Sequence, residues 1–206
     1  MVQLDSQLQE SYNQMLLSGQ SLRLVQKSWE CVVNYLPADS AGSFDLAISK
    51  NYTRLATLFA TFNQADPADN SGLNKIVNSH YFPSSHKEDA AFHLAFGSRR
   101  IPDNDAVGTS EHWYRLQRAL GVYDSLAHSL GVDEDSYTSD CYLGGIDLEA
   151  LPMVSASGEN LSTGQTIFLK CRNFGSAPAD VPRRCTLCAH FESIISISDT
   201  VTELFT

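Results

Sequence analysis

Short stretches of alternating apolar and polar residues recur along this chain, and they constrain its fold more than any other feature. Phe44, Leu46 and Ile48 share one face of an expected strand, and residues 167–171 repeat the pattern. Gly, Pro, Asn and Asp separate these runs, as is typical of turns. The regular alternation of strands and helices that a parallel α/β sheet requires is missing. The pattern therefore predicts an all-β fold, either a sandwich or a barrel.

Further runs extend this interpretation. Residues 55–62 are apolar on both faces, which is expected for a strand in the middle of a sandwich, although a buried helix could give the same run. The runs at 22–24 and 29–35 have opposite parity, which predicts a β-bulge or a break near residues 25–28. The other expected strands carry their apolar residues at Phe92, Leu94 and Phe96, at Cys185, Leu187, Ala189 and Phe191, and at Ile195 and Ile197.

One short amphipathic helix is expected over residues 110–120. Ser110 can cap its N-terminus, and Glu111 in the first turn can pair with Arg115 one turn later. Gly121 supplies the stop signal. The apolar face of this helix consists of Trp113, Leu116 and Leu120. A place for Trp113 in the core is favoured over a role in docking a partner.

The chain has 206 residues, enough to bury one sizeable core. We expect residues 1–20 to form an N-terminal arm or a helix, because Leu4, Leu8, Tyr12 and Met15 have some helical spacing. Residues 21–206 then form a single domain. Two polar stretches, residues 63–85 and 124–140, are expected to be long loops.

Charge and hydropathy narrow the function classes. The formal net charge is -10, so we expect no direct binding to nucleic acid, which needs basic surface. The adjacent pairs Arg99-Arg100 and Arg183-Arg184 are interpreted as solvated loops. No apolar run reaches the length of a membrane span, and the polar start is not that of a signal peptide. Five cysteines, an odd number, indicate free thiols in a reducing compartment.

Cys185 and Cys188 have the spacing of a metal or redox pair, which Cys171 and His190 could complete. In a strand the two cysteines point to opposite faces, so we expect Cys185 in the core and Cys188 facing outward. The acidic cluster at 133–135 is interpreted as a solvated turn, with a weak cation site as the alternative.

The histidines give no metal-binding motif either. By parity His93 and His190 face outward from their strands. A site assembled from three loop histidines is the minority alternative. Nucleophile elbows, phosphate loops and zinc-protease motifs are missing as well. The sequence therefore predicts no catalytic, cofactor-binding or metal site, and no enzyme. The six histidines are His80, His86, His93, His112, His128 and His190.

Two segments in order resemble a known family. Residues 92–103 combine an expected strand with a Gly-Ser-Arg-Arg-Ile-Pro turn, and residues 111–121 give a Glu-x-Trp-Tyr-x-Leu-x-Arg helix that ends in Leu-Gly. Residues 43–62, 142–149 and 185–205 agree in the same order. Together they resemble the C-terminal jelly roll of double jelly-roll major capsid proteins, found in large eukaryotic DNA viruses, virophages and Polinton-type elements.

The resemblance implies an antiparallel β-sandwich of the jelly-roll type with one short helical insertion. It implies a structural role in a capsid shell, self-association as a homotrimer with other capsid subunits, and possible contact with minor capsid proteins. It also implies residence in the virion after assembly in the host cytoplasm or nucleus. Members of the family normally carry two jelly rolls, whereas this chain has room for one.

Two other functions stay open on the same kind of sandwich. A binding module, lectin-like or chaperone-like, would be a stable monomer or small oligomer. A cupin-type metal enzyme is less favoured, because the His-x-His pair followed by Glu that such enzymes use is missing.

Overall fold

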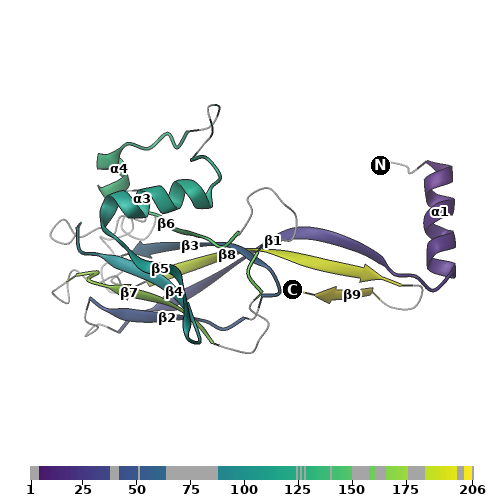
Figure 1. Cartoon of the computed structure of the whole chain (residues 1–206), viewed down its shortest axis with the longest axis horizontal. Coiled ribbons are helices and arrows are strands. Elements are labelled where there is room, and N and C mark those ends of the chain that lie inside the picture. The colour runs from purple at the N-terminus through teal and green to yellow at the C-terminus, as the bar shows by residue number, and fades with distance from the viewer. Residues whose placement is uncertain are drawn as a thin grey trace, which may run out of the picture.

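The chain folds into a β-sandwich with a long extension at one end (Figure 1). The computed structural model describes residues 5–37, 42–50, 52–63, 88–123, 125, 127, 129–139, 141–149, 158–160, 166–175, 184–198 and 202–205. The strands are β1 (Leu22–Tyr35), β2 (Phe44–Ile48), β3 (Leu55–Asn63), β4 (Ala91–Phe96), β5 (Arg99–Val107), β6 (Gly144–Asp147), β7 (Ile167–Arg172), β8 (Arg184–Ile197) and β9 (Thr202–Phe205). The helices are α1 (Ser6–Leu17), α3 (Gly108–Ala119) and α4 (Glu134–Ser139).

Two antiparallel sheets form the sandwich. Sheet A has the order β1-β8-β3-β6, with β9 pairing to β8, and sheet B has the order β2-β7-β4-β5. Strands that follow one another in the sequence therefore alternate largely between the two sheets. Eight strands wound in this order form a jelly roll, so the expected all-β fold is confirmed.

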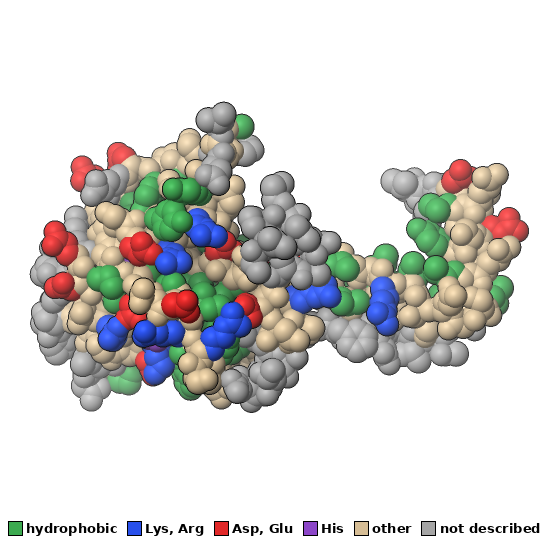
Figure 2. Space-filling view, viewed as in Figure 1, with side chains coloured by type: hydrophobic (Ala, Val, Ile, Leu, Met, Phe, Trp, Pro, Cys, Tyr) green, Lys and Arg blue, Asp and Glu red, His purple; other side chains and the backbone are tan. Residues whose placement is uncertain are grey.

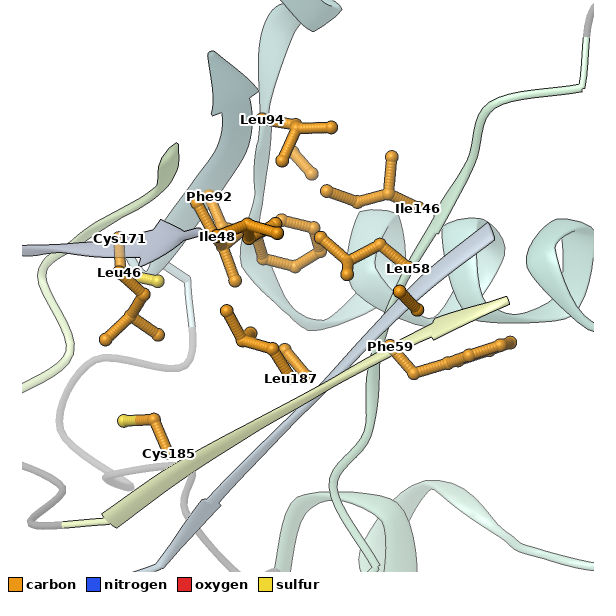
Figure 3. Packing of buried hydrophobic residues seen from close by; sticks show 14 of the residues in the cluster. Leu46, Ile48, Leu58, Phe59, Phe92, Leu94, Ile146, Cys171, Cys185 and Leu187 are labelled. Atoms are coloured by element: carbon orange, nitrogen blue, oxygen red, sulfur yellow. The ribbon is translucent and has the colours of Figure 1, made fainter. Parts of the chain in front are cut away.

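The core lies between the inner faces of the two sheets. Leu58 and Leu187 from sheet A point into the same space as Ile48 and Phe92 from sheet B (Figure 3). All four side chains are at most 4% exposed. Ile48, Phe92 and Leu187 belong to alternating runs of the sequence whose apolar residues face inside, as expected for a sheet with one buried face, and Leu58 belongs to the run that is apolar on both faces.

The strand β1 differs from its prediction. All 14 of its residues pair with β8 in one unbroken register, from Leu22 opposite Ile197 to Tyr35 opposite Arg184. The predicted bulge near residues 25–28 is therefore wrong. The apolar residues change parity because the first part of β1 extends beyond the sandwich. Neither face of this part is buried, so nothing requires apolar and polar residues to alternate there.

The strand β5 was missed, since its first residues were interpreted as a turn. It lies at the edge of sheet B, where one side needs no hydrogen-bonding partner and a proline such as Pro102 is tolerated. Arg99 and Arg100 therefore lie in a strand and not in a solvated loop.

The predicted helix exists as α3, but it starts earlier. It begins at Gly108, whose φ is +79°, and no side chain caps it, so the predicted cap at Ser110 is wrong. Its end is confirmed: Val122 N–H donates to the Gln117 carbonyl oxygen at 3.0 Å, as in a Schellman motif.

The chain has more helix than the single insertion expected. The helix α4 lies within the second predicted loop, where Asp133 Oδ1 accepts a hydrogen bond from Ser136 N–H at 2.8 Å. This contact makes Asp133 a helix cap instead of part of a solvated turn. Of the first predicted loop, only Asn63 is among the described residues. No helix in the described part of the chain is long and apolar enough to cross a membrane.

Gly145 allows α3 to lie close to sheet A. A Cβ atom at this position of β6 would lie 3.0 Å from Leu116 Cα and 3.1 Å from Ala119 Cβ. Any side chain at position 145 would therefore push the helix off the sheet.

We expect Gly145→Val to lower the free energy of unfolding by about 1–3 kcal/mol, the usual cost of overpacking. The matched control is Gly131→Val, because nothing lies within 4 Å of a Cβ at Gly131. Urea denaturation of both variants measures the difference. Equal stabilities would show that α3 does not need this close approach.

Candidate functional site

The outer face of sheet A carries an apolar surface at β1. We call Trp29, Cys31, Val33 and Tyr35 the β1 stripe; Trp29 is 59% exposed and Tyr35 is 74% exposed. The sequence predicted that apolar and polar residues alternate in this part of β1, but the apolar residues face outward instead of toward the core. The opposite parity includes Glu30, whose carboxylate accepts a hydrogen bond from Tyr52 Oη at 3.2 Å and pairs with Lys50 at 2.8 Å.

The β1 stripe continues across the sheet by ring stacking. Trp29 stacks on His190 of β8 with ring centroids 4.5 Å apart and on Phe59 of β3 at 5.8 Å. Burial and the nearby ammonium group of Lys27 hold the pKa of His190 below its ordinary value. The neutral ring therefore extends the apolar surface at neutral pH.

A disulfide joins β1 to β8 within this face. Cys31 and Cys188 lie directly opposite each other in the ladder and are bonded. The prediction that all five cysteines are free thiols is therefore wrong for this pair. Cys188 does face outward and Cys185 is fully buried in the core, so their predicted orientations are confirmed.

A second uncovered surface is the arm, by which we mean α1, β9 and the parts of β1 and β8 that extend beyond the sandwich (Figure 1). Leu24 and Val25 in this part of β1 are 45% and 54% exposed, and α1 buries no residue. Apolar and basic side chains appear along the arm in the space-filling view (Figure 2). Such a ribbon has no core of its own.

Sheet B has a charged outer face that the sequence did not predict. The Asp105 carboxylate, only 7% exposed, pairs with Arg172, with Arg100 at 3.6 Å and with His93 Nδ1 at 3.0 Å. Lys170 pairs with Asp45 at 3.1 Å beside an open hollow of about 760 Å³. The predicted outward direction of His93 is correct, but the ring is almost buried beneath these charges.

Burial and neighbouring cations disfavour the charged form of His93. Burial, together with the positive charges of Arg100 and Arg172, lowers the pKa of His93. A neutral imidazole ring can donate one hydrogen bond and accept one. The arrangement is a structural ion cluster around Asp105.

A buried polar network fixes α3 to the sandwich. His112 Nε2–H donates to the Ala106 carbonyl oxygen at 3.0 Å, and its Nδ1 accepts from Tyr142 Oη at 3.0 Å. Burial lowers the pKa of His112 to about 4 and raises that of Tyr142 well above its ordinary value. Both groups stay neutral, which suits their shared hydrogen bond.

The residues considered for metal binding do not meet. Cys185 and Cys188 point to opposite faces, and His93, His112 and His190 lie in three separate environments. Among the described residues, no group of three or more His, Cys, Asp or Glu side chains is placed to hold a metal ion. His80, His86 and His128 lie outside the described residues, as does Arg183.

Three further contacts involve residues named from the sequence. Arg99 makes a bidentate contact with Glu159, at 2.9 and 2.7 Å, so this basic side chain is engaged within the chain. Glu111 and Arg115 form the predicted pair at 2.7 Å. Trp113 is partly buried against the core, with an edge contact to Tyr137 at 4.8 Å, as favoured from the sequence.

Comparison of the fold with solved structures gives capsid-related matches, among them two from PBCV-1. PBCV-1 VP54, fitted into a cryo-EM reconstruction of the virophage Sputnik, superposes with a TM-score of 0.55 at 12% identity. A quasi-atomic model of the PBCV-1 virus capsid superposes with a TM-score of 0.56 at 11% identity. Each match covers 98% of this chain but 54% of the other.

Sequence comparisons add nothing to these matches. No protein-family model matches the chain, and no curated protein matches it significantly. At this level of identity the superposition establishes the shared fold. The chain is thus a jelly roll that spans about half the length of the PBCV-1 chains it resembles.

We expect Asp105→Asn to destabilise the fold by about 2 kcal/mol, because three neighbouring cationic or polar groups lose their shared carboxylate. This value lies between the cost of breaking an exposed pair and that of breaking a fully buried pair. The matched control is Asp45→Asn, whose pair with Lys170 is exposed and should contribute less than about 1 kcal/mol. Thermal unfolding of both variants tests this, and equal losses would contradict a structural role specific to Asp105.

His112 should make stability depend on pH. Its folded pKa of about 4 lies below the ordinary value of 6.5, so the unfolded chain takes up a proton first as the pH falls. Stability is therefore fully present above pH 6.5 and is lost progressively toward pH 4, by about 3 kcal/mol in total. Comparing denaturation curves of the protein and of His112→Gln isolates this contribution. Identical pH slopes for the two would argue against a neutral, buried His112.

Proposed function

We propose that this protein is a structural subunit of a capsid shell and not an enzyme. The observation that carries this proposal is the superposition of 98% of the chain on capsid-related jelly rolls. In the proposal, residues 21–206 form one jelly-roll domain and residues 1–20 extend from it. The role needs no catalytic residue, cofactor or metal ion.

The uncovered surfaces support a role in assembly. The β1 stripe and the arm expose large apolar side chains on a chain whose core is otherwise well filled. Apolar surface of this kind is usual where protein subunits meet. Other copies of this chain are the proposed partners, in a homotrimer, and minor capsid proteins are further ones.

The proposed setting follows from the same role. The assembled protein would reside in the virion, after assembly in the host cytoplasm or nucleus. Shell formation by contacts between jelly rolls requires no direct contact with the genome, in keeping with the net charge of -10.

We expect the purified protein to form a trimer or a larger assembly whose mass rises with concentration, because its apolar surfaces become buried between copies. Multi-angle light scattering over a concentration series, with negative-stain electron microscopy of the largest species, measures this. A strict monomer at every concentration would contradict assembly by this chain alone.

A further inference from the structure

The arm cannot be stable on the contacts that its own chain provides. Its helix α1 has 12 residues and buries none of them. Isolated helices of this length are marginal in water, and so is a narrow ribbon without a packed face. Contacts from outside this copy must therefore stabilise the arm.

The helix α1 has one apolar side. Leu8, Tyr12, Met15 and Leu16 follow the spacing i, i+4, i+7, i+8, which places them on one stripe of the helix. Asp5 caps the N-terminus by accepting a hydrogen bond from Gln7 N–H at 3.3 Å, and it lies at the end of this stripe. No basic residue occurs in this helix, and Glu10 lies on its opposite side, so the apolar stripe carries a single acid, Asp5, at its end.

The β1 stripe offers the complementary surface. It spans about 20 Å from Trp29 to Tyr35 at the usual rise of a strand, and α1 is about 18 Å long. Lys27 lies in β1 at one end of the stripe, and Arg184 lies opposite Tyr35 at the other. Between them, the residues of β1 and β8 on this face include no carboxylate, and Glu192 beyond Trp29 already pairs with Arg54 at 3.6 Å. The face is therefore apolar, with Arg184 at one end and Lys27, opposite Glu192, at the other.

The helix α1 of the same copy cannot cover this surface. It is joined to Leu22 by residues 18–21, so a helix folded back along β1 would cover about 18 Å of that strand. This length reaches from Leu22 to about Lys27, since each strand residue adds about 3.3 Å. Val33 and Tyr35 stay out of reach of this copy's own α1, so an α1 that lies over them comes from another molecule.

We propose that α1 of one copy packs across the β1 stripe of a second copy, with Asp5 near one of the two flanking cations. This inference rests on the proposed self-association and names the surfaces that carry it. Each copy donates one helix and accepts one, so the exchange closes either reciprocally between two copies or around a ring. Contact between α1 and the β1 stripe buries the apolar surfaces of both at once.

Two full-length variants test the exchange. Leu8→Gln with Met15→Gln removes the apolar side of the donated helix, and Tyr35→Glu places a like charge on the receiving face. All three positions are at least 40% exposed, so the sandwich itself should keep its stability. The matched control is Gln7→Ala with Gln14→Ala, which changes the opposite side of α1. We expect each variant to raise the dissociation constant of assembly at least about tenfold and the control to leave it unchanged.

Mixing the two variants gives the decisive readout. The helix variant keeps its receiving face and the Tyr35→Glu variant keeps its helix, so together they should form a complex of one copy of each by light scattering. If the unaltered protein assembles and both variants assemble equally well, α1 exchange is overturned while the shell proposal stands. If the unaltered protein stays monomeric at every concentration, the exchange and the self-association on which it rests are both overturned.

Discussion

The unbroken pairing of β1 with β8 is the constraint on which the rest of the structure depends. Each strand has 14 residues, and one register holds from end to end. Because side chains alternate faces, this register decides that Trp29 and Tyr35 face outward while Leu187 and Ala189 face the core. One part of this ladder belongs to the sandwich, and the other part extends beyond it as the base of the arm. The disulfide between Cys31 and Cys188 bonds the two strands at the fifth pair from the Tyr35 end of the ladder.

The strands that could be predicted from the sequence are those with one buried face. The runs in β2, β4, β7 and the inner part of β8 have their apolar parity inside, because burial selects for it. The edge strand β5 was missed because Arg99, Arg100 and Pro102 suit a turn equally well when the neighbouring strand is unknown. In β1 the alternation identified a strand, but it could not show that the apolar face lies outside the sandwich.

Contacts between distant residues explain what was missed at the candidate site. The pair Glu111–Arg115 is local, so helical spacing alone predicted it. The burial of His112 depends on Tyr142, and that of Asp105 depends on Arg172, which only the folded sheets bring close. His112 is fully buried and Asp105 nearly so, yet both are polar. A hydropathy pattern therefore does not predict that they are buried. The outward orientation of His93 could be predicted from strand parity, but not the charged neighbours that cover it.

The ladder between β1 and β8 also has a consequence for how the chain acquires its structure. Cys31 and Cys188 are separated by 157 positions, so β1 must wait for nearly all of the intervening chain to be synthesised before it finds its partner. Contacts of such high sequence separation make folding slow, because loop-closure entropy is lost before they form. During that interval the apolar side chains of β3 and the β1 stripe are exposed together on a nascent chain. Aggregation during biosynthesis, more than unfolding afterwards, is therefore the main hazard that this topology creates.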